Sequence, residues 1–280
     1  MPEFIREDLS GSRFERVRFI GAEFRSVNLT DVTMRGALVK DATLHGLELR
    51  NVDITGELVN VTVNGVDIGP LVEAELDRRH PDRAKMRPTD PAGFRAAWDV
   101  VERLWDGTVQ RARTFDPALL HESVDGEWSF TETQRHLVFA TECWIYRGIL
   151  GQPAPWHELS LPWDEMPDTP GVPRDRAARP SLDEVLELRR DRMATVRELV
   201  DDLTEEFLAG DTEPVDGVGW PPSGESFPVR ECLLTVLNEE WEHRLYAERD
   251  LDALASSDRA NSGCVDSGRG SSGTGSTVSP

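Results

Sequence analysis

The sequence predicts an α+β protein with two main parts, a short repeat solenoid followed by a four-helix bundle. Within the first 60 residues, apolar residues recur at every fifth position. That spacing matches neither the period of about 3.6 of a helix nor the period of about 2 of a strand. From Gly93 onward, four segments instead carry apolar residues at three- and four-residue spacing, which is typical of helices that bury one face.

The predicted solenoid is defined by eleven apolar residues spaced five apart. Most residues two places before them are small or aliphatic, and the intervening positions are mostly polar. Such a period suits a repeat in which each unit turns the chain by a fixed angle and points one large side chain inward. The eleven residues are Leu9, Phe14, Phe19, Phe24, Leu29, Met34, Val39, Leu44, Leu49, Ile54 and Val59.

This pattern over residues 9–60 resembles the pentapeptide-repeat family, whose units centre on Leu or Phe with a small residue two places before. The resemblance implies a short right-handed quadrilateral β-helix with four repeats per coil, so eleven repeats form fewer than three coils. Several units depart from the family pattern and have Val or Leu at the small position. We place this domain at residues 1–68, and we expect so short a solenoid to lean on the next domain.

Residues 69–92 are predicted to form a helical connector. Pro70 can begin a short helix that continues to about Arg79. Pro81, Pro88 and Pro91 then prevent that helix from continuing.

Residues 93–255 are predicted to form the four-helix bundle. Ser129 is followed three residues later by Glu132, a capping box that places the start of the second helix at Ser129. About 30 Pro-rich residues separate the second and third helices, and a loop of that length is usually functional or crosses the bundle. The predicted helices span residues 93–115, 129–150, 181–209 and 226–254.

The remaining residues, 256–280, are rich in Ser and Gly and are predicted to be a disordered tail, with no role for Cys264. The chain has 52 acidic and 31 basic side chains, a net charge of -21, which argues against binding nucleic acid through phosphates. No apolar run approaches the roughly 20 residues of a membrane helix. The N-terminus lacks the features of a secretory signal, and the three cysteines form no close pair. We therefore expect a cytoplasmic protein.

His136, Glu239 and His243 are the candidate metal ligands. His136 lies two turns into the second predicted helix, and Glu239 and His243 share a face of the last one. If these helices face each other, two imidazoles and a carboxylate converge and leave coordination positions open, which suits Zn, Ni or Fe(II). The simpler alternative is a solvated Glu–His pair and a core histidine bonded to a carbonyl.

Trp128-Ser129 followed by His136-Leu137 resembles the W-S-(x)6-H-L signature of the DinB-like superfamily of four-helix bundles. The similarity covers residues 93–254. In that family three histidines bind a divalent metal, so the resemblance makes His136 the first ligand and His243 the last. Glu239 occupies the position of the family's middle histidine, and this departure either alters the metal preference or weakens binding.

The resemblance implies a metal-dependent transferase or isomerase that presents a thiol cofactor to a small-molecule electrophile. The loop segment 155–175 resembles an actinobacterial subgroup, and together with the Arg-rich composition it favours mycothiol as the thiol. Two alternatives stay open at this point. One is a non-catalytic scaffold that engages a protein partner or a second copy through the β-helix. The other is a metal-dependent hydrolase that uses water as the nucleophile.

Catalytic and thiol-binding residues are not identified by the sequence. Cys143 and Cys232 lie within predicted helices, so we interpret them as packing residues rather than nucleophiles. Three aromatic residues in the helices are interpreted as core or pocket wall, namely Trp144, Trp241 and Tyr246. Three ring-bearing residues of the long loop either line a pocket mouth or anchor the loop, namely Trp156, His157 and Trp163.

Overall fold

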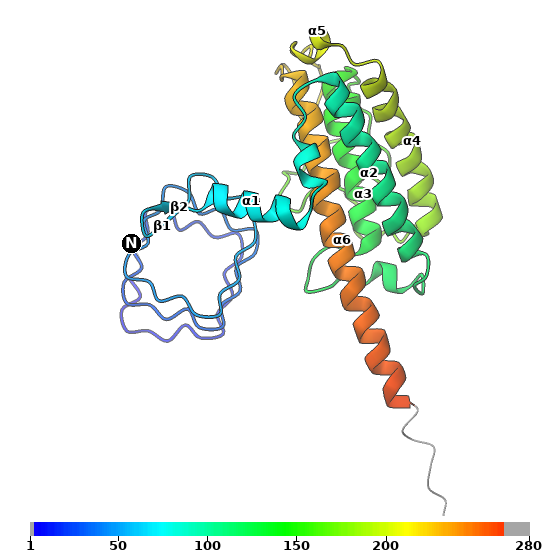
Figure 1. Cartoon of the computed structure of the whole chain (residues 1–280). Coiled ribbons are helices and arrows are strands. Elements are labelled where there is room, and N and C mark those ends of the chain that lie inside the picture. The colour runs from blue at the N-terminus through cyan, green and yellow to red at the C-terminus, as the bar shows by residue number, and fades with distance from the viewer. Residues whose placement is uncertain (1–2, 266–280) are drawn as a thin grey trace, which may run out of the picture. The chain divides into compact units, whose positions relative to one another are not determined.

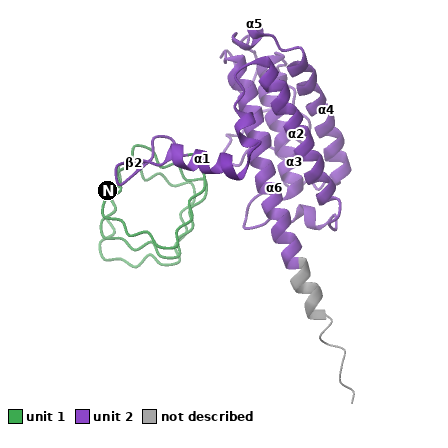
Figure 2. Ribbon diagram, in the orientation of Figure 1, with its two compact units in different colours: residues 1–57 green, residues 58–280 purple. Residues whose placement is uncertain are grey.

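The computed structural model describes residues 3–265, and residues 258–265 by their backbone alone. The chain divides into two compact units, residues 1–57 and residues 58–280 (Figure 2). The division falls earlier than residue 68, where the sequence places it, because a small β-hairpin after residue 60 belongs to the second unit.

The first unit winds in successive turns with flat sides and corners (Figure 1). Residues with positive φ recur every five positions from Arg6 to Gly56, so each repeat bends the chain in the same way. At Gly11, where φ is 76°, the corner is closed by the Ser12 N–H, which donates to the Leu9 carbonyl at 3.0 Å. Glycine adopts this left-handed conformation without the steric penalty of a Cβ. The five-residue period of the sequence therefore corresponds to one bend of the chain in every repeat.

The apolar side chains of the repeats are exposed in the first unit. Among the eleven regularly spaced residues, the exposed fraction runs from 43% at Leu9 to 69% at Ile54. The rings of Phe14, Phe19 and Phe24 meet edge to face, with successive centroids 5.7 Å apart. No β-strand is assigned among residues 3–57, so the repeats are observed as a regular series of turns.

The second unit begins with a β-hairpin, β1 (Thr62–Val63) and β2 (Val66–Asp67). Its register pairs Thr62 with Asp67 and Val63 with Val66. Asn64 and Gly65 form the turn with φ of 51° and 81°, and Asn-Gly is the favoured dipeptide for a tight hairpin turn of this hand.

Two short helices follow the hairpin, α1 (Gly69–Arg79) and the 3-10 helix η1 (Arg83–Met86). Pro70 lies in the first turn of α1, as the sequence predicts. Arg83 links the two elements, because its guanidinium lies 2.7 Å from Glu73 and 2.9 Å from Asp77. These contacts hold α1 against η1.

Four long helices pack side by side in the described part of the second unit (Figure 1). They are α2 (Pro91–Ala112), α3 (Phe130–Thr141), α4 (Leu182–Asp201) and α6 (Val229–Val265). Helix α3 continues without a break as the π-helix η3 (Glu142–Ile149). Helices α2 and α3 each contact both α4 and α6, which closes the bundle around one core.

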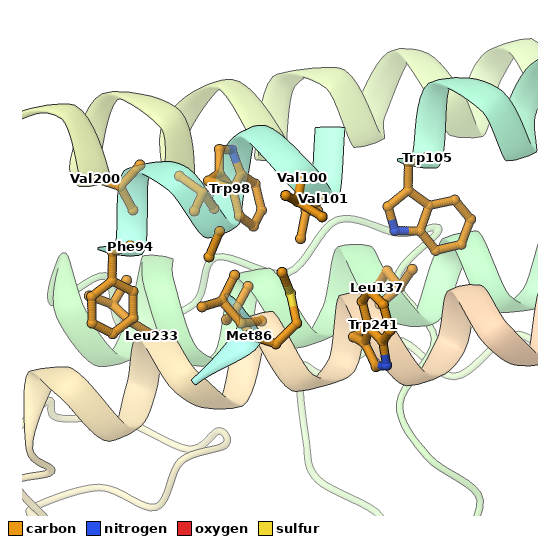
Figure 3. Close-up of a cluster of buried hydrophobic side chains, with 14 of the residues drawn as sticks. Met86, Phe94, Trp98, Val100, Val101, Trp105, Leu137, Val200, Leu233 and Trp241 are labelled. Atoms are coloured by element: carbon orange, nitrogen blue, oxygen red, sulfur yellow. The ribbon is translucent and has the colours of Figure 1, made fainter. Parts of the chain in front are cut away.

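Large side chains from all four helices fill this core (Figure 3). Helices α2 and α6 together contribute most of them, and the apolar residues of α2 recur along one face. The core residues labelled in Figure 3 are Met86, Phe94, Trp98, Val100, Val101, Trp105, Leu137, Val200, Leu233 and Trp241.

Two helix ends differ from the sequence expectation. Helix α4 ends at Asp201, because Thr204 acts as a new N-cap for the short helix α5 (Glu205–Leu208) and accepts the Phe207 N–H at 3.1 Å. Helix α6 continues to Val265, past residue 255, where the sequence ends the bundle. The rest of the predicted tail, residues 266–280, lies outside the described residues.

A second 3-10 helix, η2 (Leu119–His121), precedes α3. None of the helices among the described residues has the length and apolar character that a bilayer crossing requires.

Candidate metal centre

His136, Glu239 and His243 come together between α3 and α6. One ligand atom from each side chain lies within 4.8 Å of the other two. The His136 Nε2 is 3.3 Å from the Glu239 Oε2, and the His243 Nδ1 is 3.2 Å from the same oxygen. The three residues that their helical spacing selected therefore share one site, and the facing of the two helices that the sequence analysis required is observed.

The register of α3 is set by its N-terminus. The Ser129 hydroxyl accepts the Glu132 N–H at 3.3 Å, and the Glu132 carboxylate accepts the Ser129 N–H at 2.9 Å. This is the reciprocal capping box that the sequence predicts, and it fixes where the first turn begins. His136 is consequently on the inner face of the bundle, where its side chain is only 7% exposed.

Each imidazole is oriented by a main-chain carbonyl. The His136 Nδ1 lies 3.0 Å from the Leu161 carbonyl oxygen, and the His243 Nδ1 lies 3.0 Å from the Glu239 carbonyl oxygen. A ring nitrogen that faces a carbonyl oxygen carries a proton, so we assign a proton to the Nδ1 of both rings. In His136 the lone pair is then on Nε2, the nitrogen that faces Glu239, and a metal-binding histidine is usually held in this way. In His243 the protonated Nδ1 faces both the carbonyl and the carboxylate of Glu239.

His136 has an oxygen acceptor opposite each ring nitrogen. A neutral imidazole has one N–H, so it can satisfy the Leu161 carbonyl or the Glu239 carboxylate but not both. With the proton on Nδ1, the Nε2 lone pair faces the carboxylate, an arrangement that a bound cation would stabilise. Two atoms that each lie about 2.1 Å from a tetrahedral Zn²⁺ are about 3.4 Å apart, close to the observed 3.3 Å. The donor set and its spacing thus fit a divalent cation.

The charges of the triad also suit a cation. Burial opposes ionisation of Glu239, but the hydrogen bond and charge of His136 and the charge of His243 outweigh it and lower the pKa of Glu239 below its usual value. Burial and the neighbouring His136 lower the pKa of His243 to about 4. At neutral pH the site therefore offers an ionised carboxylate and a neutral His243 imidazole.

Aromatic side chains surround the two histidines. The Trp128 ring lies 4.4 Å from the His136 ring and 5.9 Å from the His243 ring, measured between centroids. Tyr246 meets His243 edge-on at 6.0 Å and is 43% exposed, so it borders the open side of the site. The side chains of Glu239 and His243 are 28% and 18% exposed, so the triad is less covered on this side than at His136.

The long Pro-rich loop between η3 and α4 covers another side of the site. Trp156 stacks on Phe139 of α3 with centroids 5.4 Å apart, and Trp163 lies 6.1 Å from the same ring. The His157 N–H donates to the buried Glu142 carboxylate at 3.2 Å. Of the two interpretations given to these loop residues, anchoring describes all three contacts.

Glu142 is the first residue of the π-helix and ties three segments together. Its carboxylate accepts from Arg192 of α4 at 2.7 Å and from the Ser160 hydroxyl of the loop, besides the His157 N–H. π-Helical turns are frequent near functional sites. Here the turn directs a carboxylate into the loop that carries the Leu161 carbonyl.

The two cysteines of the bundle are packing residues. Cys143 and Cys232 are buried. Burial, reinforced by the charges of Glu142 and Glu239, raises the pKa of the Cys143 thiol well above its usual value. Burial raises the pKa of Cys232 to about 11. Neither supplies a thiolate near neutral pH.

Sequence reasoning missed the groups that orient the triad. The Leu161 carbonyl belongs to the loop, and nothing in its local sequence indicates a partner 25 residues earlier in the chain. Trp128 was noticed only as part of a signature, although its place directly before the N-cap of α3 could have indicated a side chain at the entrance of the site.

Comparison with known families confirms the resemblance stated for both parts of the chain. The model of the DinB superfamily matches residues 100–247, and the model of pentapeptide repeats matches residues 8–36. No curated protein and no solved structure matches the chain. Because the first match spans more than half of the 280 residues and includes the whole candidate centre, the chain belongs to the DinB superfamily.

Proposed function

We propose that the protein is a metal-dependent enzyme of the DinB type, a transferase or isomerase that presents a mycothiol-like thiol to a small electrophile. The observation that carries the proposal is the convergence of His136, Glu239 and His243 within 4.8 Å. Members of the DinB superfamily often bind metals, and the donor set fits Zn, Ni or Fe(II). Glu239 in place of a histidine supplies one negative charge, which offsets part of the charge of a divalent ion.

A bound divalent cation would lower the pKa of a coordinated thiol or water. The chain's own residues prepare the site for that chemistry. The carbonyls opposite the Nδ1 atoms keep the rings in one tautomer and orientation. Trp128 lies against both imidazoles and covers part of that side. A ligand therefore reaches the centre past Glu239, His243 and Tyr246.

The deciding experiment is elemental analysis of protein purified without added metal. We expect roughly one divalent ion per chain in the wild type, and loss of that ion in His136→Ala and His243→Ala. His121→Ala is the matched control, because His121 is a partly buried histidine of the same unit that is not part of the triad. A wild type without metal, or a variant of the triad that keeps it, contradicts the proposal.

A second assay separates transferase from hydrolase. Conjugation of monochlorobimane that requires mycothiol supports the transferase. Hydrolysis of ester or amide substrates without any thiol supports the hydrolase, in which water is the nucleophile. Both activities are expected to fall with His243→Ala, since both use the same centre.

The first unit supports a second candidate function, self-association through the repeats. In this proposal a second copy covers part of the apolar surface that residues 9–60 expose. The motivating observation is the exposure of Phe14, Phe19 and Phe24, at 57%, 50% and 62%. Sedimentation of the full chain is expected to report a dimer that the triple change to Ser abolishes. Phe207→Ser, an exposed Phe of the second unit, is the control.

A further inference from the structure

We infer that Arg135 is a positioning residue for the metal centre, because it holds the loop whose Leu161 carbonyl fixes the His136 ring. The inference rests on the proposed metal site. The hydrogen bonds of the Arg135 side chain all go to main-chain carbonyls of the loop and not to an imidazole. Arg135 is 1% exposed and precedes His136 directly on α3.

The Arg135 guanidinium joins two separate stretches of the loop. Its Nε donates to the Leu159 carbonyl at 2.8 Å. Its terminal nitrogens donate to the Asp175 carbonyl at 2.6 Å and to the Ala178 carbonyl at 3.5 Å. A planar group with several fixed donors is suited to binding carbonyls that are far apart in the sequence. One side chain therefore joins the stretch around Leu159 to the last part of the loop.

The main chain completes the connection to the site. The Leu161 N–H donates to the Arg135 carbonyl at 3.2 Å, and the Leu161 carbonyl accepts from the His136 Nδ1 at 3.0 Å. Leu161 is consequently bound on both of its polar groups by two consecutive residues of α3. The Arg135 side chain holds Leu159, two residues earlier, and thus limits how far the Leu161 carbonyl can move.

Loss of this clamp has a specific chemical consequence. If the Leu161 carbonyl moves away, the His136 Nδ1 loses its acceptor, while Glu239 Oε2 still lies 3.3 Å from Nε2. The proton then favours Nε2, where it can donate to the carboxylate. That tautomer places a proton where a cation would bind. Changes in groups that orient metal ligands typically weaken metal affinity about 10- to 100-fold.

Arg147 provides a matched control. It lies on the π-helix that continues α3 and is also 1% exposed. Its guanidinium likewise donates to loop carbonyls, at 2.9 Å to Pro221 and 2.7 Å to Gly217. These two carbonyls belong to a different loop. Arg147 also donates to the Pro153 carbonyl, near the start of the loop that carries Leu161, but to none of the carbonyls that Arg135 binds. Arg147→Gln therefore removes an equally buried clamp without releasing the stretch next to Leu161.

The experiment uses the full chain, labelled with ¹⁵N and freed of metal with a chelator, and follows the histidine ring nitrogens by NMR at neutral pH. His136→Ala identifies the His136 signals. In the wild type and in Arg147→Gln we expect a protonated His136 Nδ1. In Arg135→Gln we expect a population with an unprotonated Nδ1, and in Arg135→Lys a smaller one, since a single ammonium replaces only part of the fork.

Competition with a chromophoric chelator measures Zn²⁺ affinity in the same variants. We expect a loss of about 10- to 100-fold in Arg135→Gln, a smaller loss in Arg135→Lys, and a change within about twofold in Arg147→Gln. A His136 Nδ1 that stays protonated in Arg135→Gln overturns the inference. The same tautomer change in Arg147→Gln overturns it too, because general loosening would then be the cause.

The two readouts separate this inference from the proposed function. A wild type that binds no Zn²⁺ contradicts the metal-dependent function, whereas the tautomer of His136 in metal-free protein still tests the role of Arg135. If Arg135→Gln does not fold, as judged by near-ultraviolet circular dichroism, Arg135→Lys is read by the same criteria.

Discussion

Replacing Arg189 by Met should strongly destabilise the bundle, because it breaks a buried ion pair. Arg189 of α4 and Glu240 of α6 form two parallel hydrogen bonds of 2.8 Å each. Their side chains are 2% and 1% exposed. The Met side chain fills part of the space but leaves the Glu240 carboxylate buried without its partner. Breaking a buried pair in this way costs about 3–5 kcal/mol.

The double variant Arg189→Met/Glu240→Leu should recover most of that loss. With both charges absent no buried ion is left unpaired, and such replacements are often neutral in stability. Two contacts of Arg189 remain lost, the hydrogen bond from Nε to the Gln134 Oε1 at 3.4 Å and the position of the guanidinium 5.6 Å from the Trp105 ring centroid. We therefore expect the double variant to lie within about 1 kcal/mol of the wild type. The coupling energy between the two positions should then be at least about 2 kcal/mol in the double-mutant cycle.

Urea unfolding followed by tryptophan fluorescence measures these differences. All eight tryptophans lie between residues 98 and 241, so the signal reports the second unit and not the repeats. In thermal unfolding followed by the same signal, Arg189→Met should lower the melting temperature by roughly 6–20 °C, taking about 2–4 °C per kcal/mol for a unit of this size. If the single and double variants were equally unstable, lost packing rather than an unpaired charge would be the cause, and the reasoning would be refuted.

Three further predictions concern the same unit. Ser129→Ala removes the N-cap hydroxyl of α3 and should cost about 1 kcal/mol in urea unfolding, whereas Ser129→Thr should cost less. Trp98→Ala removes a core side chain that is 1% exposed and should lower the free energy of unfolding by about 3–5 kcal/mol. A loss under about 1 kcal/mol would mean that the core collapses around the cavity. In a Cys264→Ser variant, Ellman's reagent at pH 8 should label Cys143 and Cys232 only after denaturant is added, because their raised pKa values keep both thiols protonated.

Local sequence predicted the elements whose cause is local. The repeats were predictable because their five-residue period is a property of each unit, and the structure has a corner in every one. The start of α3 was predictable because the capping box at Ser129 lies within four residues. The end of α4 was not predicted, since a helical pattern continues past Asp201 and only the N-cap role of Thr204 separates α5 from it.

The switch to a π-helix at Glu142 had no signal in the sequence. Its carboxylate accepts from a loop N–H and from Arg192 of α4, and both partners come from segments that follow η3 in the chain. A change in helical geometry that depends on distant partners cannot be read from neighbouring residues. The long Pro-rich loop was recognised as functional or crossing, but its path across the site was not predicted.

In the candidate centre, too, the local features were predictable and the contacts between distant segments were not. Glu239 and His243 were found because two ligands one helical turn apart are a local pattern, and His136 was found because a signature marks it. What makes the three a candidate site is the direction of the two imidazoles, which is set by the Leu161 carbonyl for His136 and by the Glu239 carbonyl for His243. A helix determines which residues share a face, whereas a tautomer depends on a single hydrogen bond from elsewhere in the fold. Identity of the ligands is therefore a matter of sequence, and their competence to bind a cation is a matter of tertiary structure.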